Sequence, residues 1–458
     1  MRNLLIKAVL LHLKFWAKVT LRLNRPYIIG IAGSVGKSST RNALYAVLKD
    51  NLSTKVVSGN SETGVPLGIL GLKLPAYSNK EWLKVISRAP RKIFNLKNTE
   101  YLIVEMGIDD PHPPKNMGYL LSIVKPDMAI DLNVTATHTM QFEKIMPKNV
   151  KNPLNFLLKK IAEEDSKIIT SSNCKVAIYN GDDTYLVDAI EKKQNEIRAK
   201  LLTFGIKKED TLRLSTYEIT PHKTKFTYIF EGQRVEKQIS LSFQGMMLPP
   251  AYQETFAAVF LACFEIGLKD VQIKEDLEKN YRLPPGRSSI FTGVRNSMLI
   301  DSTYNSSKES VISFLKMLKT LKNKTNRIVI FVMGDMRELG QQSESEHNEV
   351  AEELIKIVDY LYCVGQNTNE YVVPFVRDAI SKRQGCIKRV EWYKNAVQLA
   401  LQLKEDLPEN AIILFKGSQN EVFLEEAVKF LITNPQDLKL LPRQDEYWMR
   451  IKQNFFSV

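Results

Sequence analysis

The sequence predicts an α/β protein of two main domains, preceded by a basic amphipathic helix. Short apolar runs alternate with helical stretches from residue 27 onward, which is the pattern of parallel strands joined by helices. A glycine-rich segment follows the first of these runs and opens a helix, as in nucleotide-binding folds. The 458 residues are also too many for one ordinary core, so two or three domains are expected.

Composition narrows the class of protein. Hydrophobic residues make up 44% and charged residues 25%, and no apolar run is long enough for a membrane-spanning helix, so we expect a soluble protein. The four cysteines lie far apart, so their spacing indicates neither a zinc knuckle nor a dense disulfide framework and fits a reducing cytoplasm best. The net charge of +13 is compatible with a polyanionic partner, a membrane surface or a small anionic substrate.

The first 26 residues are predicted to form the basic helix. Nine basic residues and no acidic one occur between Met1 and Lys49, and Asn3 to Leu23 is rich in Leu, Val, Phe and Trp. Lysines and arginines recur at helical spacing along one stripe. Two interpretations stay open: the helix packs on its own protein or a second copy, or it lies at a membrane surface and is attracted to anionic lipid.

Residues 27–284 are predicted to form a central domain with a mostly parallel sheet. An antiparallel section is expected at Thr216 to Phe243, where apolar and polar residues alternate, and a helix at Gln253 to Ile266. Ligands of such a sheet bind beyond the carboxyl ends of its strands. The expected strands are Tyr27 to Ala32, Leu102 to Glu105 and Asp127 to Asn133, with a helix at Lys37 to Leu48.

Residues 285–458 are predicted to form a second α/β domain after a hinge at Pro284-Pro285-Gly286. Apolar runs indicate its strands, and longer periodic stretches indicate its helices. The expected strands are Ser297 to Asp301, Arg327 to Met333, Tyr360 to Val364 and Ala411 to Lys416, and the expected helices are Lys308 to Leu321 and Glu421 to Ile432.

A phosphate-binding loop is predicted directly after the first strand. Glycines let backbone N–H groups close on phosphate oxygens, and the amino terminus of the following helix adds positive potential. Lys37 would reach the β and γ phosphates, and Ser38 would hold Mg²⁺. A chance Gly-Lys-Ser in a turn is the alternative. The loop residues are Gly33, Ser34, Val35, Gly36, Lys37, Ser38 and Ser39.

Glu105 is the candidate carboxylate for the metal that accompanies the phosphates. It ends the strand that begins at Tyr101, and a phosphate loop of this kind needs such a group to hold Mg²⁺. No Asn-Lys-x-Asp guanine-recognition segment follows, so ATP is the expected nucleotide. Taken alone, Glu105 would also suit a salt bridge at the end of a strand.

Several separated segments resemble the Mur ligase family, and within it the MurF-type branch. They occur in family order along the chain, which a chance likeness would not produce. The segments are Gly33 to Ser39, Asn60-Ser-Glu-Thr-Gly64-Val-Pro66-Leu, Glu105-Met-Gly, Asn133-Val-Thr-Ala-Thr-His138, Asn180-Gly-Asp182-Asp183, Gly286-Arg287, Ile300-Asp301-Ser-Thr-Tyr304-Asn305, Gly334-Asp335-Met-Arg-Glu338-Leu-Gly340 with His347, and Lys416-Gly-Ser418.

The resemblance implies a central P-loop ATPase domain and a carboxyl-terminal Rossmann-like domain, with ATP and Mg²⁺ as cofactors. By analogy Ser38 and Glu105 bind metal, and His138 belongs to a second metal site. The analogy adds nucleotide contacts from Asn180 and Asp183, from Arg287 to phosphate, and from Asp301 to ribose. Lys416 and Ser418 would approach the amine substrate or the phosphate. Taken alone, His138 also suits a buried histidine of the core.

The resemblance also implies a function in peptidoglycan synthesis. A MurF-type enzyme is an ATP-dependent ligase that adds D-Ala-D-Ala to a UDP-MurNAc-peptide carboxylate through an acyl phosphate. Such an enzyme works in the cytoplasm, and at the inner membrane face if the basic helix is interfacial; no nucleic-acid partner is expected. One alternative is a related ligase that joins another amine to a different carboxylate, such as that of a lipid-linked precursor. Another is a non-catalytic ATP-binding scaffold for cell-wall enzymes.

Two departures from the family pattern affect these expectations. Many Mur ligases carry a carbamylated lysine within a stretch resembling Ile-Ala-x-Ala-Lys-x-Glu-Ile, where this chain has Ile161-Ala-Glu-Glu-Asp165-Ser-Lys167-Ile168. Our hypothesis is that Asp165, or the adjacent Glu164, supplies the negative charge directly; the alternative is a solvated acidic helix face. The second departure is that about one helix takes the place of the uridine-binding domain of MurF-type enzymes. The binding of a nucleotide sugar is therefore expected to differ.

Overall fold

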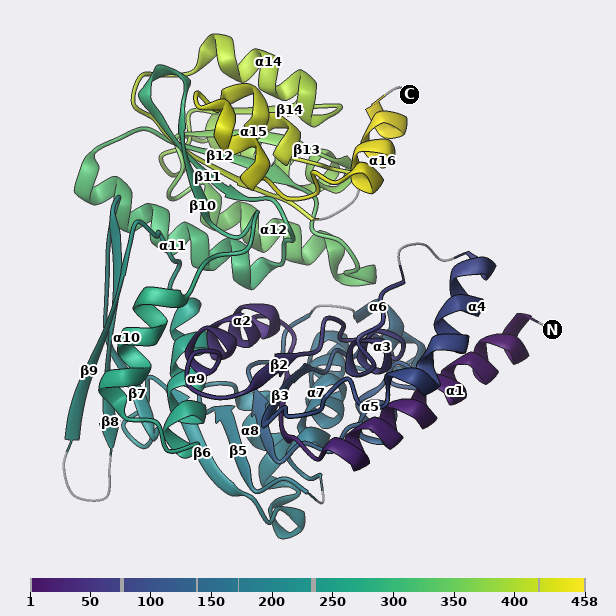
Figure 1. Ribbon diagram of the computed structural model, residues 1–458. Coiled ribbons are helices and arrows are strands. Elements are labelled where there is room, and N and C mark those ends of the chain that lie inside the picture. Colours follow the sequence, from purple (N-terminus) through teal and green to yellow (C-terminus); the bar gives the residue numbers. More distant parts are fainter. Residues whose placement is uncertain are drawn as a thin grey trace. The chain divides into compact units, whose positions relative to one another are not determined.

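The computed structural model describes residues 2–74, 78–136, 139–171, 173–231, 236–418 and 421–456. It confirms the α/β class and divides the chain into two compact units (Figure 1). The predicted division into residues 1–26, 27–284 and 285–458 stays a prediction. The first unit comprises Met1–Thr216, Phe226–Leu241 and Tyr252–Arg282, and the second comprises Tyr217–Lys225, Ser242–Ala251 and Leu283–Val458.

In the larger sheet, the first strand in sequence, β1, is the third strand from one edge. Its order within the described residues is β2-β3-β1-β4-β5-β6-β7-β8-β9, and the pairs from β2 to β7 are parallel. Two residues separate β7 from β8 and four separate β8 from β9, and such short connections permit only antiparallel pairs. The strands are β1 Tyr27–Ala32, β2 Thr54–Val56, β3 Tyr101–Glu105, β4 Met128–Asp131, β5 Val176–Asn180, β6 Lys200–Gly205, β7 Leu212–Thr220, β8 Lys223–Glu231 and β9 Glu236–Gln244.

The helices of the first unit cover this sheet, and nearly every residue of the inner strands β1, β3 and β4 is buried. One apolar layer joins Ala32 of β1 and Ala129 of β4 to Ile161 and Ala162 of α7. The helices are α1 Arg2–Asn24, α2 Lys37–Leu48, α3 Gly64–Ile69, α4 Asn79–Arg88, α5 Met117–Leu121, α6 Thr139–Phe142, α7 Pro153–Asp165, α8 Thr184–Glu191, α9 Tyr252–Glu265 and α10 Asp270–Asn280, with a 3₁₀ turn η1 at Ala89–Lys92.

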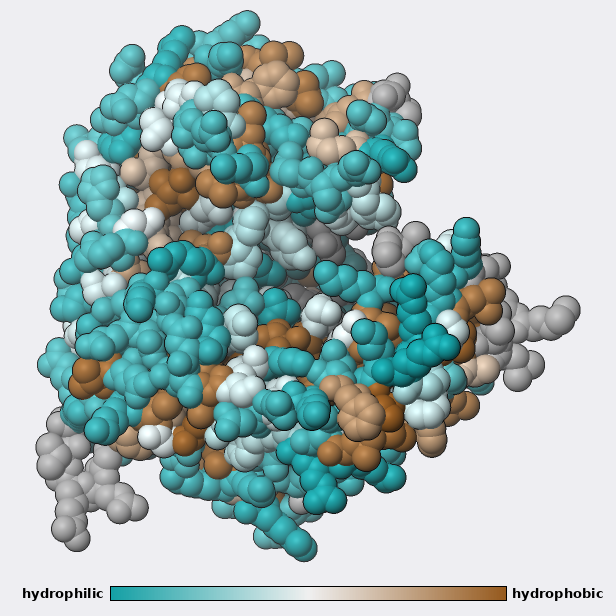
Figure 2. Space-filling view, viewed as in Figure 1, coloured by the Kyte–Doolittle hydropathy of each residue, from teal (hydrophilic) through white to brown (hydrophobic). Residues whose placement is uncertain are grey.

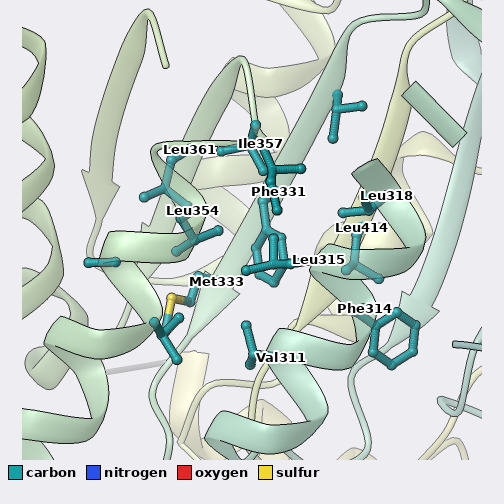
Figure 3. Close-up of a cluster of buried hydrophobic side chains, with 14 of the residues drawn as sticks. Val311, Phe314, Leu315, Leu318, Phe331, Met333, Leu354, Ile357, Leu361 and Leu414 are labelled. Atoms are coloured by element: carbon teal, nitrogen blue, oxygen red, sulfur yellow. The ribbon is translucent and has the colours of Figure 1, made fainter. Parts of the chain in front are cut away.

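The second unit contains a smaller sheet of order β10-β11-β15-β12-β13-β14 within the described residues. All its pairs are parallel except β10 with β11. Alternate residues of its strands enter two apolar clusters, one on each face. Figure 3 shows one cluster, in which Phe331 and Met333 meet side chains of the two helices over that face. The strands are β10 Ser289–Gly293, β11 Ser297–Ser302, β12 Val329–Gly334, β13 Tyr360–Val364, β14 Arg389–Tyr393 and β15 Ile412–Lys416.

One predicted helix of this unit was too long at its start. The prediction began at Glu421, but α15 begins at Glu425, because Glu421 and Phe423 have left-handed φ values of 59° and 44°. A right-handed helix cannot include such residues. The helices are α11 Lys308–Thr325, α12 Ser343–Leu354, α13 Val373–Ser381, α14 Ala396–Asp406, α15 Glu425–Leu431 and α16 Glu446–Phe456.

The amino-terminal helix α1 packs on its own unit along one side. Leu13 and Ala17 are fully buried, and Leu13 shares an apolar cluster with Val85 of α4 and residues of α3. The His12 ring nitrogen lies 3.1 Å from the carbonyl oxygen of Ile86. This packing agrees with the first of the two interpretations of the helix, and it leaves the other side of α1 free. No helix in the described part of the chain is long and apolar enough to cross a bilayer.

Candidate active site

The loop between β1 and α2 has the conformation that a phosphate site requires. Gly33 and Gly36 have φ values of 118° and 91°, in the left-handed region that favours glycine. A Cβ atom on Gly33 would lie 3.0 Å from the backbone nitrogen of Asn133, so this loop accepts no side chain there. Gly36 also caps α2 without a side chain, which leaves the N–H groups of the first turn without a side-chain acceptor.

The segment after β4 holds this loop in place. The backbone N–H of Ser34 donates to the Asn133 carbonyl at 2.8 Å, and that of Val35 donates to the Asn133 side chain at 3.0 Å. The Ser34 hydroxyl accepts from the Thr135 N–H at 2.9 Å. The Lys37 ammonium donates to the carbonyl oxygens of Gly33 and Ser34, so it lies over the loop that it is predicted to serve.

Ser38, Glu105 and Arg41 meet beside the loop. The Ser38 hydroxyl donates to Oε2 of Glu105 at 3.0 Å, which joins the first turn of α2 to the end of β3. Arg41, one turn further along α2, forms an ion pair with Oε1 of Glu105 at 2.7 Å. The carboxylate is buried and lies between a hydroxyl and a cation, at the carboxyl end of a parallel strand that has neighbours on both sides.

Two aspartates are buried beneath the loop. Asp131 ends β4 and is directed toward α7, because Ala129, two residues earlier, packs in the same apolar layer as Ala162. Asp165 lies three residues after Ala162 and is 1% exposed. Neither carboxylate oxygen of Asp131 has a hydrogen-bond partner among the described residues. Burial raises the pKa of Asp131 well above its usual value, nearby Asp165 and Asp183 raise it further, and Lys37 opposes them.

A second carboxylate pair supports the segment after β4. Asn133 donates from its side-chain amide to Glu254 at 2.9 Å, and burial raises the pKa of Glu254 to about 7. Asp183 caps α8 and also accepts the Val134 N–H at 2.6 Å. The Asn180 side chain accepts from the Asp182 N–H at 2.9 Å. Asp183 is thus next to the loop segment, whereas the Asn180 contact stabilises its own turn.

His138 lies outside the described residues, so its predicted place in a second metal site has no geometry to report. Among the described residues, no group of three or more His, Cys, Asp or Glu side chains has an arrangement that could hold a metal ion.

The remaining predicted residues gather in the second unit. Asp301 and Lys416 lie on the neighbouring strands β11 and β15, and Asp301 accepts from the Thr303 N–H and hydroxyl at 3.0 and 2.7 Å. The buried Lys416 ammonium donates to the Asn305 carbonyl at 2.9 Å. Burial and then Arg287 lower the pKa of Lys416 to about 7, against the effect of Asp301. Burial raises the pKa of Asp301 to about 6.

A buried ion cluster fixes the segment that follows Asp301. Arg443 forms an ion pair with Glu425 at 2.6 Å and donates to the Thr303 carbonyl at 2.8 Å. Lys452 contacts the same Glu425 carboxylate at 2.8 Å. The Arg287 guanidinium lies 4.7 Å from the centre of the Tyr304 ring, which places it over this segment.

The structure therefore forms two groups from the predicted residues. Lys37, Ser38 and Glu105 meet at the loop, and Arg287, Asp301 and Lys416 gather in the second unit. Sequence reasoning missed Arg41, Asp131 and Glu254. A signal existed for Asp131, because it is an acidic residue in a run of apolar residues at the carboxyl end of a predicted parallel strand. Arg41 and Glu254 lie on helices and had no comparable signal.

Comparison with known proteins gives consistent likenesses. The family model described as "Mur ligase middle domain" matches residues 31–248, and "Mur ligase, glutamate ligase domain" matches residues 286–419. The UDP-N-acetylmuramoyl-tripeptide--D-alanyl-D-alanine ligase of Rickettsia prowazekii is 25% identical over 406 residues, which cover 88% of this chain and 77% of that protein. The protein of the same name from Escherichia coli is 23% identical and covers 89% and 77%.

Solved structures share the fold. A MurF ligase from Thermotoga maritima, in complex with ADP, has a TM-score of 0.68 at 19% identity and covers 92% of this chain and 83% of its own. A MurF from Acinetobacter baumannii has a TM-score of 0.65 at 20% identity and covers 92% and 78%.

Proposed function

Because the chain belongs to the Mur ligase family, whose members are ATP-dependent ligases, we propose that it joins D-alanyl-D-alanine to the peptide carboxylate of a UDP-N-acetylmuramoyl-tripeptide. One structural observation identifies residues that could perform this reaction. A glycine loop with Lys37 over it adjoins the Ser38 hydroxyl and the Glu105 carboxylate, 3.0 Å apart. These are the groups needed to bind a triphosphate together with its metal.

The loop suits transfer of the terminal phosphoryl group of ATP to a carboxylate. A carboxylate does not react with an amine in water, so it must first become an acyl phosphate. Attack of one anion on another requires that charge be neutralised, and Lys37 is the cation at the loop. Transfer of the terminal phosphoryl group to the carboxylate leaves ADP. The amine then attacks the acyl carbon and displaces phosphate, which forms the amide.

Mg²⁺ is the metal that we assign to this site. When bound, it would screen the phosphate and carboxylate charges from each other. Ser38 and Glu105 are the proposed ligands in the described chain, and His138 is the residue that the family implies for a second metal site. The buried and unpartnered carboxylate of Asp131 fits a cation nearby, because an isolated buried charge is otherwise costly.

Asp165 is proposed to supply the negative charge that a carbamylated lysine supplies in relatives. Its proximity to Asp131 supports this role over that of a solvated helix face, since Asp165 is buried. The Asp165→Ala variant should lose rate and need more Mg²⁺ for half-maximal turnover. Unchanged rate and Mg²⁺ dependence would show that Asp165 has no part in metal binding.

Three residues of the second unit are proposed to contact the nucleotide or the amine substrate. Arg287 would contact phosphate and Asp301 the ribose, while Lys416 would lie near the amine or the phosphate. The buried position of Lys416 and its lowered pKa support a role beside an anion, which would restore the protonated form. Asn180 and Asp183 are proposed to lie near the nucleotide, Asp183 through its contact with the segment after β4.

Phosphate release tests the proposal with purified protein, ATP, Mg²⁺ and UDP-MurNAc-tripeptide, in the presence and absence of D-Ala-D-Ala. Turnover that requires D-Ala-D-Ala, with the amide product detected by mass spectrometry, supports it. Turnover only with other amines points to the related ligase, and ATP binding without any turnover points to the scaffold.

A further inference from the structure

Helix α1 presents a second, outward side that its own protein does not cover. Leu11 and Phe15 are 64% and 57% exposed, although both are large apolar residues. They lie on one side of the helix because they are four residues apart. Figure 2 shows apolar side chains gathered on the surface over α1, at the lower right of the molecule. We call Leu11, Phe15 and the three cations described next the outer face of α1.

Basic residues lie on the same side of the helix, both before Leu11 and after Phe15. Lys7 precedes Leu11 by four residues, Lys18 follows it by seven and Arg22 by eleven, so all three share its side. Lys7 and Arg22 are exposed and Lys18 is partly exposed. In the described part of the chain none of the three forms an ion pair, and no acidic residue occurs from residue 1 to 49.

The inner side of α1 makes this arrangement rigid. Leu10, Leu13, Ala17 and Thr20 recur at the complementary helical positions and are buried. Lys14 is fixed at the border by contact with the Ser122 hydroxyl at 2.5 Å and with the Tyr119 ring. The outer face is therefore already folded before it meets a partner, so binding would not require the helix to form.

A basic groove lies next to the anchored side of α1. It is about 570 Å³ in volume and is formed by α4, η1 and the segment after α3. Its wall includes Val85, which packs with Leu13 of α1. Five cations and one carboxylate line the groove: Lys73, Lys84, Arg88, Arg91, Lys92 and Glu81. The excess of positive charge thus extends beyond α1 to a hollow of a size that admits an anionic headgroup.

The charge pattern decides between possible partners. In a symmetric contact with a second copy, the same face meets itself, so Lys7, Lys18 and Arg22 would be brought together without counter-charges. An anionic lipid surface instead accepts the apolar side chains below its headgroups and leaves the flanking cations among the phosphates. The outer face of α1 fits the second case in both respects.

We propose that the outer face of α1 binds the surface of membranes that contain anionic phospholipid. The helix lies along the surface, Leu11 and Phe15 enter the acyl boundary, and Lys7, Lys18 and Arg22 contact lipid phosphates. This proposal does not depend on which amide the protein makes, since it concerns no substrate residue.

Vesicle flotation of the full chain tests it, with vesicles of phosphatidylcholine alone and of phosphatidylcholine mixed with phosphatidylglycerol. The affinity of the protein for the anionic vesicles should be higher than that for the neutral vesicles by about tenfold or more, and added salt should weaken the binding. The Leu11→Ser/Phe15→Ser variant and the Lys7→Gln/Lys18→Gln/Arg22→Gln variant should each reduce binding about tenfold or more.

Matched controls use residues of the same kinds elsewhere. Val271→Ser removes an apolar side chain of α10 that is 58% exposed, and Lys316→Gln/Lys319→Gln/Lys404→Gln removes three exposed charges of the second unit. Both should bind anionic vesicles as the wild type does, and circular dichroism should show every variant folded.

Three results would overturn the proposal. The first is no binding, or equal binding to neutral and anionic vesicles. The second is an equal loss of binding in the control variants. The third is a wild-type dimer by light scattering that the Leu11→Ser/Phe15→Ser variant converts to a monomer without any change in vesicle binding, which would assign the face to a second copy.

Discussion

The two units differ in the charged side chains that they bury at the ends of their sheets: the first buries acids, and the second buries a cation next to an acid. In the first unit, Asp131 and Glu254 are buried acids whose pKa values are raised mainly by burial, and neighbouring carboxylates add to the effect. The second unit also buries a cation, Lys416, beside the acid Asp301, and the pKa of Lys416 is lowered to about 7 by burial and by Arg287. An opposite charge partly counters the pKa shift in each unit: Lys37 counters that of Asp131, and Asp301 counters that of Lys416.

The difference indicates what each unit is suited to receive. A buried charge without a partner is costly, and a ligand of opposite charge removes that cost. The first unit therefore suits a cation beside its phosphate loop, and the second suits an anion near Lys416. The ion cluster of Glu425, Arg443 and Lys452 is a useful contrast, because its charges are paired within 2.6 to 2.8 Å and it needs no ligand.

The largest expected effect is the loss of turnover when the positive charge of Lys37 is removed. Lys37→Met removes the positive charge over the loop while keeping an unbranched side chain, so phosphoryl transfer should slow about a thousandfold or more. ATP-dependent product formation measures this. Lys49→Met, at the exposed far end of α2, is the matched control and should keep normal turnover. Wild-type turnover in Lys37→Met would contradict the assignment of the loop.

The second largest effect is expected from a buried acid, Asp131, and it tests whether this carboxylate serves a bound cation. Asp131→Asn removes a buried negative charge at nearly constant shape, so the protein should become more stable without Mg²⁺. The Mg²⁺ concentration for half-maximal turnover should rise about ten- to hundredfold. Thermal unfolding with and without Mg²⁺ checks the first effect, and a metal titration of activity checks the second.

The exposed Asp188 of α8 provides the control as Asp188→Asn, which should change neither quantity. A loss of stability in Asp131→Asn, with no change in the metal titration, would mean that the carboxylate serves the fold and not a cation.

A smaller effect concerns the cation of the second unit. Between pH 7 and 10.5 the folded protein holds fewer protons on Lys416 than the unfolded chain does, so the free energy of unfolding rises with pH in this window. The rise is at most about 1.4 kcal/mol per pH unit. Lys416→Met should flatten this dependence in urea unfolding, whereas Lys404→Met on the exposed face of α14 should retain it. An identical slope in wild type and Lys416→Met would exclude the lowered pKa.

The smallest effect has the opposite sign and belongs to the first unit. Between pH 4.5 and 7 the folded protein holds more protons on Glu254 than the unfolded chain does, so stability falls as pH rises through this window. Glu254→Gln can still accept the hydrogen bond from Asn133 and should remove that part of the fall. Urea unfolding compares it with Glu275→Gln, an exposed residue of α10 that should behave as the wild type. A steeper fall in Glu254→Gln would contradict the raised pKa.

Much of the fold was predictable because local pattern and tertiary structure agree in these segments. The strand Tyr27–Ala32 and the helix Lys37–Leu48 have the predicted bounds, since an apolar run, two glycines and a periodic stretch leave few alternatives. The start of α15 was not predictable, because left-handed residues such as Phe423 are set by packing of buried side chains and not by local propensity.

The candidate site was predictable only in its local part. Lys37 and Ser38 share one motif, and Glu105 ends a recognisable strand. The contacts of Arg41 with Glu105, and of Glu254 with Asn133, join segments up to 121 residues apart and depend on how helices lie against the sheet. Periodicity places a residue on a side of its own helix, but it does not name the partner on another element.

The sequence of the second unit is discontinuous, which affects both folding during synthesis and the design of fragments. Tyr217–Lys225 and Ser242–Ala251 belong to the second unit but are interspersed among segments of the first. Ile219 and Met247 from these segments are fully buried with residues of α11 and β12. A ribosome therefore delivers part of the later core well before the rest of it, and a fragment that starts at residue 283 would expose the apolar surface that those two side chains cover.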